Sequence, residues 1–288
     1  MAEISASMVA KLRKITGQGM MDCKSALQEA GGDIDQAIQI LRKKGLATLA
    51  RRAERETSEG LVVAKLSDDG RTAVLATLCC ETDFVARSEG FVAAAEALAQ
   101  CAIACSAHQG AENVLEAKHQ GRQFKDVLTE TAGKTGEKTE VGDYAKYTLG
   151  GPGLIGTYVH FNGKVGSMVQ IETSNEKVAA ADVLKRAASD IAMHVTAAKP
   201  MALDKDGIDA ETIERERAIF AAQVKNKPPD IVEKIVQGKM KKFFVENCLL
   251  EQRFVKDDSK SVAQVVDEAA KQAGGEAKIK RFVRFEVG

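Results

Sequence analysis

Residues 72–88 read TAVLATLCCETDFVARS, and this pattern predicts a strand, a sharp corner and the beginning of a helix. Successive side chains of a strand point to opposite faces, and one face of this strand is apolar: Val74, Ala76, Leu78 and Cys80. A second apolar run, 61–67, precedes it across Asp68-Asp69-Gly70, and an Asp-Gly pair is typical of a hairpin turn. An Ala-rich helix over about 88–106 follows. The segment is therefore predicted to be a β-hairpin followed by a helix.

The same succession recurs further along the chain. Runs 154–161 and 164–172 flank the turn Asn162-Gly163, and a helix over about 175–196 follows. A shift of 91 positions lays the apolar face of the first strand on a second set: Val165, Ser167, Val169 and Ile171. We interpret the two segments as related hairpin-plus-helix subdomains of an α+β fold. Chance similarity between two amphipathic hairpins is the alternative.

Residues 5–45 carry dense helix start and stop signals, which predict three short helices. Side chains that can cap a helix N-terminus stand at three places: Ser5, Asp22 and Asp33. Glycines that can end a helix follow each of them: Gly17, Gly31-Gly32 and Gly45. A unit of about 40 residues is near the lower size limit for independent folding, so part of its apolar surface is expected to meet something else. Met20 and Met21, in the predicted loop between the first two helices, are the candidates; the alternative is that both close the small core.

The remaining segments complete the organisation. Pro228-Pro229 cannot continue a helix, so residues 209–248 are expected to form a helical hairpin with these apolar anchors: Phe220, Ile231, Ile235, Phe243 and Phe244. Residues 249–255 are expected to be extended, and a strand over 279–287 is expected to join the second sheet. Glycines amid polar residues suggest that 110–150 is a linker between subdomains.

These segments define the expected domains. They are a three-helix domain, 1–50; a basic segment, 51–59, that is a linker or a helix extension; core subdomain N, 60–150; core subdomain C, 151–202 with 248–288; and the helical hairpin, 203–247.

Composition excludes several classes of protein. Lys and Arg number 41 and so do Asp and Glu among 288 residues, so a broad nucleic-acid surface is not expected. No run approaches the 18 or so apolar residues of a membrane span, and Met1–Ser5 lack the pattern of a signal peptide. Six cysteines without Cys-x-x-Cys spacing fit reduced thiols. We therefore expect a cytoplasmic protein without nucleic-acid or membrane contacts.

The chemical motifs are weak. Gly151–Gly156 has the spacing G-x-G-x-x-G, but a strand follows it where a dinucleotide site needs a helix. The four histidines are scattered: His108, His119, His160 and His194. Cys101 and Cys105 could hold half a metal site, although a small apolar pair in a core is the better interpretation. With no P-loop and no nucleophile motif, neither an enzyme nor a metal or other cofactor is expected.

The informative feature is Thr82-Asp83-Phe84-Val85, at the corner between strand and helix. The Phe84 ring either tucks against Val92 of its own helix or points outward. The second repeat has Ser174-Asn175 at the equivalent place, without an aromatic. Because the shared architecture does not require this ring, we favour a contact role.

Several blocks of sequence resemble the elongation factor Ts family, the guanine-nucleotide exchange factors of elongation factor Tu. They are TGQGMMDCKSAL (16–27) with GDIDQA (32–37), TDFV (82–85), IAMHV (191–195) with Lys199-Pro200, and RFVRFEVG (281–288). The resemblance implies a ubiquitin-associated-like three-helix domain, a core of two α+β subdomains, and an inserted helical hairpin used for dimerisation. Packing of that hairpin on its own core remains the alternative.

The resemblance also implies a set of partner contacts. Asp83 and Phe84, flanked by Thr82 and Val85, would enter the G domain of elongation factor Tu beside its Mg²⁺ and phosphate-binding loop. The other implied contacts are Arg13, Met20, Met21, Lys24, His160 and Val255. The partner would be bound both with GDP and free of nucleotide. Family members often continue past the final strand into a helical module, so that additional contact is not expected here.

A second hypothesis comes from another class of protein. In a ubiquitin-associated-type adaptor, the three-helix unit would bind a partner and the rest would serve as scaffold. It predicts that residues 1–50 alone retain binding and that Phe84→Ala has no effect.

Overall fold

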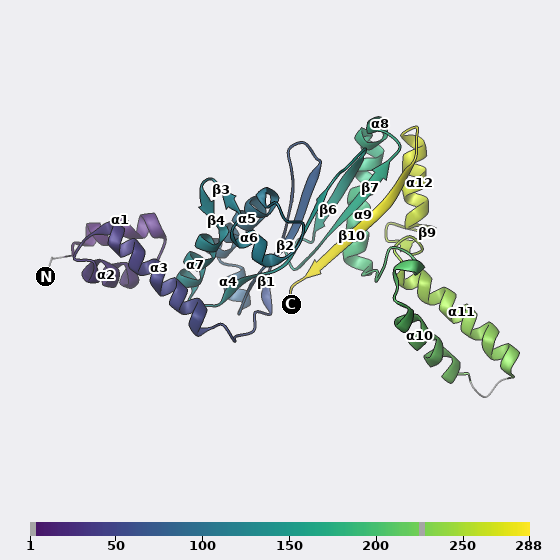
Figure 1. Cartoon of the computed structure of the whole chain (residues 1–288), viewed down its shortest axis with the longest axis horizontal. Coiled ribbons are helices and arrows are strands. Elements are labelled where there is room, and N and C mark those ends of the chain that lie inside the picture. Colours follow the sequence, from purple (N-terminus) through teal and green to yellow (C-terminus); the bar gives the residue numbers. More distant parts are fainter. Residues whose placement is uncertain (1–3, 225–227) are drawn as a thin grey trace.

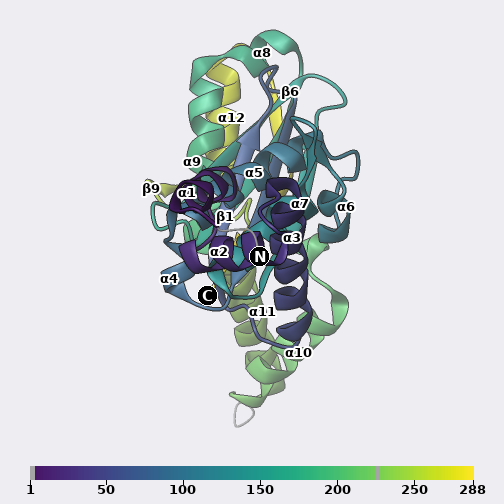
Figure 2. The ribbon, with the colours of Figure 1, turned by 90° about the vertical axis from the view of Figure 1, so that its left-hand side faces the viewer.

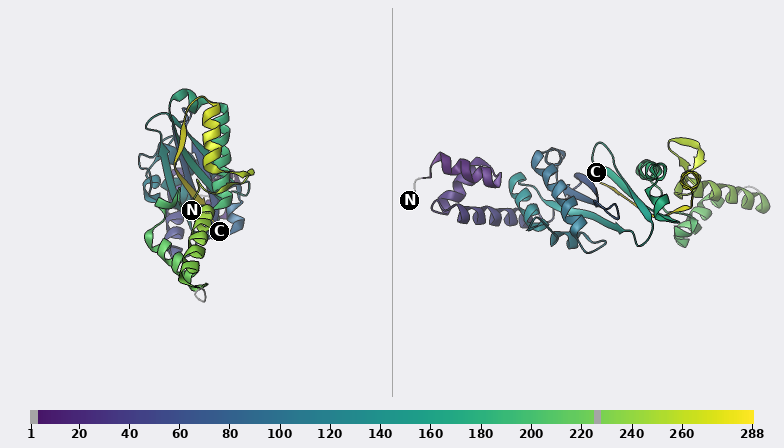
Figure 3. Two further views of the ribbon diagram at one scale, coloured as in Figure 1. Left: turned by 90° about the vertical axis from the view of Figure 1, so that its right-hand side faces the viewer. Right: turned by 90° about the horizontal axis from the view of Figure 1, so that it is seen from above.

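The computed structural model describes residues 4–224 and 228–288. The three N-terminal helices, the two three-stranded sheets and a helical hairpin follow one another along the long axis of the molecule (Figure 1). The view from above in Figure 3 shows the same row. Residues 1–3, part of the N-terminal segment tested for a signal peptide, and 225–227, before Pro228, lie outside the described residues.

The N-terminal unit consists of α1 (Ala6–Thr16), α2 (Met20–Glu29) and α3 (Ile34–Arg51). The expected caps at Ser5 and Asp33 are confirmed, since their side chains accept hydrogen bonds from the N–H groups of Met8 and Gln36. The predicted start of α2 is wrong. The helix begins at Met20 after Gly19. Asp22 lies in its first turn, where the negative charge of a carboxylate interacts favourably with the positive end of the helix dipole.

Gly45 does not end the third helix, because α3 continues to Arg51. This glycine is buried against α7 (Phe124–Thr135), and a Cβ atom added to it would lie 2.4 Å from the carbonyl oxygen of Thr129. Gly133 of α7 lies opposite, where an added Cβ would come 3.3 Å from the Gly45 Cα. The two glycines therefore let the helix backbones approach closely, and α3 joins the N-terminal unit to the core. Only Arg51 of the basic segment is helical, and turns follow it.

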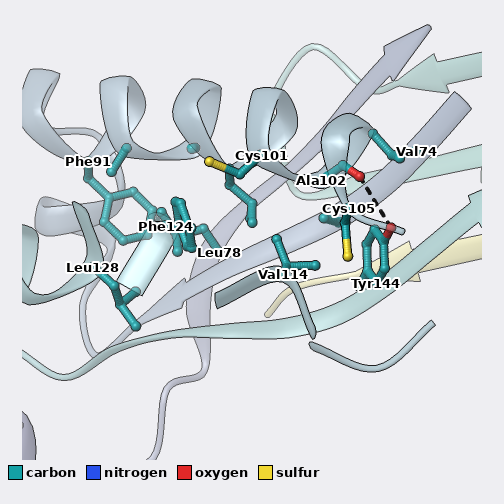
Figure 4. Close-up of a cluster of buried hydrophobic side chains, with 14 of the residues drawn as sticks. Val74, Leu78, Phe91, Cys101, Ala102, Cys105, Val114, Phe124, Leu128 and Tyr144 are labelled. Carbon is teal, nitrogen blue, oxygen red and sulfur yellow. Dashed lines mark hydrogen bonds between the residues drawn. The ribbon is translucent and has the colours of Figure 1, made fainter. Parts of the chain in front are cut away.

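The first subdomain is an antiparallel sheet in the order β1-β2-β5: β1 (Glu59–Leu66), β2 (Thr72–Cys80) and β5 (Thr139–Thr148). The hairpin and the helix after it, α5 (Glu89–Ala104), are confirmed, with Ser88 as the N-cap. The apolar face of β2 lies in a core that α5 and α7 cover, as Figure 4 shows with Phe91 of α5 and Phe124 of α7. Tyr144 of β5 closes this core, and its single hydroxyl proton is shared between the carbonyl oxygens of Ala102 (3.2 Å) and Ala107 (2.8 Å). Figure 4 draws the bond to Ala102.

The interpretation of 110–150 as a linker is wrong. The segment contains α6 (Ala111–Leu115), the short strands β3 (Lys118–His119) and β4 (Arg122–Gln123), then α7 and β5. Its glycines have structural roles: Gly136 ends α7 at φ 71°, and Gly133 is a packing contact. Phe124 is fully buried in the first core.

The second subdomain repeats this plan in a sheet of order β10-β7-β6: β6 (Gly153–Val159), β7 (Val165–Thr173) and β10 (Ala277–Glu286). In both sheets the third strand pairs with the second strand of the hairpin. The C-terminal strand thus joins the second sheet, as expected. On the matched face of β7, Ser167, Val169 and Ile171 are buried and Val165 is half-buried.

Helices cover the second sheet in three pieces. The single helix expected over 175–196 is divided at Ala181 into α8 (Glu176–Ala180) and α9 (Asp182–Ala198). A further helix, α12 (Val262–Gln272), packs beside α9, and Ser261 begins it with a capping box.

The helical hairpin is formed by α10 (Ala210–Ala222) and α11 (Pro229–Asn247), and it extends away from the sheets (Figures 1 and 2). A 3₁₀ turn, Lys205–Gly207, precedes it. Of the expected anchors, Ile231 is exposed, whereas Val236 and Met240 are the buried side chains of α11. Residues 249–255 are mostly turn, with a short strand β8 (Arg253–Phe254) paired to β9 (Asp257–Ser261), so the expectation of an extended segment is wrong.

A buried polar cluster joins the base of the hairpin to α9. His194 accepts a hydrogen bond at Nδ1 from the N–H of Val255 (3.1 Å), and its Nε2 lies 3.0 Å from Gln252 Oε1. Gln252 donates in turn to the carbonyl oxygens of Glu246 (2.8 Å) and Ala198 (3.3 Å). Because Nδ1 accepts, Nε2 carries the proton and the ring is neutral. Burial lowers the pKa of His194, an effect that the bond to Gln252 opposes.

This cluster predicts a pH dependence of stability. When the folded pKa of a histidine is depressed, the unfolded chain takes up the proton first as the pH falls. The stabilisation is therefore complete above the unfolded pKa of about 6.5 and is lost progressively as the pH falls from that value towards and through the lower folded pKa. Urea unfolding midpoints at about pH 8 and pH 5.5 should differ more for the unaltered chain than for His194→Gln. His108→Gln, at an exposed histidine, is the control, and its midpoints should differ between the two pH values as much as those of the unaltered chain. An equal difference in all three proteins would contradict the prediction.

Candidate functional site

One helical turn, α4 (Asp83–Ala86), forms the corner between β2 and α5. Thr82 caps it, since its hydroxyl oxygen accepts from the N–H of Val85 (3.4 Å). Ser88 then caps α5 in the same way through the N–H of Phe91. With a cap at each side, this short turn has a defined backbone conformation.

Phe84 points outward from this turn. Its side chain is 83% exposed, while Ala86 is buried and Val85 packs partly against the first core. The ring is therefore not tucked against Val92, and of the two arrangements considered, the outward one is present. Asp83 forms an exposed ion pair with Arg87 (3.1 Å), and such pairs contribute little to stability.

The N-terminal candidates lie on the surface of the helical unit. Met20 and Met21 are 58% and 73% exposed and belong to the first turn of α2, so their placement in a loop was wrong. Their exposure also contradicts the alternative that both close the small core. Lys24 follows them by four and three residues and so shares their side of α2; it is exposed, as is Arg13 of α1.

His160 lies at the end of β6, where its Nδ1 is 3.1 Å from the Tyr158 hydroxyl and its ring centroid is 4.4 Å from that of Phe161. The β6–β7 turn is bonded to β1, because Val62 donates its N–H to the carbonyl oxygen of Gly163 (2.7 Å). The turn α4 also packs on β1. Phe84 and His160 are thus carried by segments that meet at one strand.

Val255 lies apart from these residues, in the second subdomain. Its side chain is 53% exposed, and its backbone is held by His194. The structure therefore gathers the corner and His160 around β1, and it places the α1–α2 residues and Val255 on other units.

Two residues that adjoin the candidate contacts were not predicted from the sequence, one beside His160 and one bonded to Thr82. Phe161 is 91% exposed beside His160, and its position before the Asn162-Gly163 turn was the available signal. Glu137 accepts a hydrogen bond from the Thr82 hydroxyl (2.7 Å). No local pattern indicates this contact, because the two residues are 55 positions apart.

The other chemical motifs do not form sites. Gly151–Gly156 lead into β6, so the helix that a phosphate loop requires is absent at this place. Cys101 and Cys105 are buried in the first core, and burial raises the pKa of the Cys101 thiol. Across residues 4–224 and 228–288, no group of three or more His, Cys, Asp or Glu side chains could hold a metal ion. None of the helices in those ranges combines the length and apolarity of a membrane span.

Comparison with known proteins identifies the relatives of this chain. Residues 81–288 match the family model described as elongation factor TS, a match that begins directly before the corner. The chain belongs to the elongation factor Ts family. It is 46% identical over 287 residues to elongation factor Ts of Nitratiruptor sp., covering 99% of this chain and 93% of that protein. Elongation factor Ts of Chlorobium phaeobacteroides is 41% identical over 293 residues, with both proteins covered fully.

A third relative, elongation factor Ts of Clostridium botulinum, is 41% identical over 287 residues, covering 99% of this chain and 93% of that protein. These alignments include the three N-terminal helices, which the family model does not match. The elongation factor Ts family assignment therefore applies to nearly the whole chain and places it among the elongation factors of protein biosynthesis.

Proposed function

We propose that this chain is a guanine-nucleotide exchange factor that binds elongation factor Tu·GDP and promotes GDP release during translation elongation. The observation that supports this proposal is the outward Phe84 ring on a capped turn, in a chain of the elongation factor Ts family. The ring enters the G domain of the partner, Asp83 fixes the loop, and Thr82 and Val85 flank the contact. As a translation factor it acts in the cytoplasm.

The mechanism is thermodynamic linkage without covalent chemistry. An exchange factor binds the nucleotide-free partner more tightly than the GDP-bound partner, and by reciprocity GDP weakens factor binding by the same ratio. A ratio of about 10⁴ requires roughly 5.5 kcal/mol of differential contact. Mg²⁺ neutralises phosphate charge in proteins of the partner's type. Insertion of Phe84 that displaces this Mg²⁺ and the phosphate-binding loop removes much of what holds GDP.

The experiment measures release of labelled GDP from elongation factor Tu in excess unlabelled GDP, with and without this chain. Substoichiometric chain should accelerate release over many turnovers. Binding without acceleration would contradict the proposal and favour the adaptor hypothesis.

The N-terminal helices supply a second contact through Met20, Met21, Arg13 and Lys24, and His160 and Val255 add smaller ones. Replacing both Met20 and Met21 with alanine should shorten the lifetime of the complex by roughly fivefold to tenfold, because interface anchors are commonly worth more than 1 kcal/mol. Stability should not change, since both side chains are exposed. Surface-immobilised kinetics measures the lifetime, with Met201→Ala as the control at another exposed methionine. An unchanged lifetime for the double variant would remove the methionines from the interface.

The proposal includes self-association through the helical hairpin, where Ile219 and Ile231 are exposed. Light scattering of the isolated protein should give the mass of two chains. The mass of one chain would remove the hairpin as a dimerisation module.

A further inference from the structure

Glu137 makes the densest set of contacts to the backbone that leads into α4. It directly follows Gly136, which ends α7, and precedes β5. Its Oε2 accepts from the N–H groups of Glu81 (3.2 Å) and Thr82 (3.1 Å), and its Oε1 accepts from the Thr82 hydroxyl (2.7 Å). One carboxylate thus holds the last two residues before the corner.

Glu81 returns these contacts. Its Oε1 accepts from the N–H of Lys138 (2.6 Å), and its Oε2 accepts from Arg52 Nη1 (2.7 Å), just beyond the end of α3. Burial alone would raise the pKa of Glu81, but the Lys138 N–H and the Arg52 guanidinium together hold it below its ordinary value. Residues 81–82 and 137–138 are therefore tied in both directions by charge-assisted hydrogen bonds, which are stronger than neutral ones.

The exposed ring depends on this support. A side chain that is 83% exposed has few contacts of its own, so its direction is set by the backbone that carries it. That backbone begins at Thr82, which caps α4 and is held by Glu137. A contact group that must enter a partner binds more tightly when its orientation is fixed beforehand, because less conformational freedom is lost on binding.

We propose that Glu137 is a positioning residue: it fixes residues 81–82 so that α4 presents Phe84 in the orientation that enters the partner. This inference rests on the proposed exchange function. Glu137 acts through Phe84 and does not touch the partner. Removing its carboxylate leaves the ring present but lowers the fraction of molecules in which the ring is correctly directed. The apparent affinity falls in proportion to that fraction.

The test is a double-mutant cycle in the full-length chain, read out as release of labelled GDP from elongation factor Tu. Glu137→Ala should slow release about fivefold, the loss expected when the competent fraction falls to about one fifth. In a Phe84→Ala background the same change should have no further effect, because residues that act as a unit are not additive. Glu140→Ala is the matched control: this neighbouring carboxylate bonds to Thr57 and Lys138, not to residues 81–82.

The outcomes separate the inference from the proposed function. Normal release with Glu137→Ala, or an equal loss with and without Phe84, would overturn the positioning role. If Phe84→Ala alone had no effect, the exchange mechanism would fail instead.

A second measurement covers the case in which Glu137→Ala does not fold. In Glu137→Gln, which keeps the size of the side chain, amide hydrogen exchange should become faster at residues 81, 82 and 85 and stay unchanged in the core strand β2. Unchanged protection at those three amides would also overturn the inference.

Discussion

Replacing Phe84 with alanine is expected to slow release of labelled GDP from elongation factor Tu at least tenfold relative to the unaltered chain, without unfolding the protein. Because the ring is exposed, its removal leaves no cavity in the core, and the unfolding midpoint should stay within the small range typical of surface substitutions. A tenfold change in rate corresponds to about 1.4 kcal/mol of transition-state stabilisation, which is within what one buried aromatic contributes to an interface.

Leu66→Ala is the matched control for this measurement. Leu66 is another exposed apolar side chain, at the opposite end of β1 from the residues that meet α4. The Leu66→Ala variant should accelerate GDP release as much as the unaltered chain does. If Phe84→Ala also accelerated release at the parent rate, the ring would have no part in exchange, and the adaptor hypothesis, in which the three-helix unit alone binds, would gain support.

The second large effect is expected at Gly45. An alanine there gains helix propensity worth up to about 1 kcal/mol, but its Cβ would lie 2.4 Å from the Thr129 carbonyl oxygen. The Thr129 carbonyl oxygen belongs to the helix backbone and cannot move without shifting α7, so α3 and α7 must separate. Overpacking of this kind lowers the free energy of unfolding by about 1–3 kcal/mol. We therefore expect Gly45→Ala to lower the urea unfolding midpoint in spite of the better helix former.

Gly238→Ala is the matched control, because it makes the same substitution within another helix. Gly238 lies within α11, and an added Cβ would meet nothing within 4 Å. The free energy of unfolding of this variant should rise by up to about 1 kcal/mol, because alanine is the better helix former and because it lowers the conformational entropy of the unfolded chain. Equal gains at both positions would mean that the α3–α7 approach imposes no steric limit on residue 45.

The parts of the fold that were predictable are those determined by near neighbours. Ser5, Asp33 and Gly17 act on helix ends within four residues of themselves. The two hairpins are specified by short apolar runs on either side of Gly-containing turns. Gly45 was misinterpreted because a glycine that ends a helix and a glycine that admits a second helix look alike until the second helix is placed.

The segment 110–150 shows the same limit. Phe124 and Tyr144 become core residues only when α7 and β5 fold back on β2 and α5, and the polar residues between them hide this from a local window. The outward orientation of Phe84 was predictable from the comparison of two repeats, one with the ring and one without. Its support by Glu137 was not, because that contact depends on tertiary structure alone.

The uninterrupted course of α3 has a consequence for how a partner is recognised. Arg42 pairs with Asp126, and Gln18 donates to the carbonyl oxygen of Glu130 (3.3 Å). Side chains of the N-terminal unit are therefore bonded to α7, and α3 runs without a break from that unit to its contact with α7. The methionines of α2 and the aromatic corner are consequently held at a fixed distance from each other. A partner that meets both gains a chelate advantage with no tether to order. The partner can contact the methionines and the corner at once only in a conformation whose two binding surfaces lie at that spacing. A change of partner conformation between nucleotide states would therefore be enough for this chain to distinguish those states.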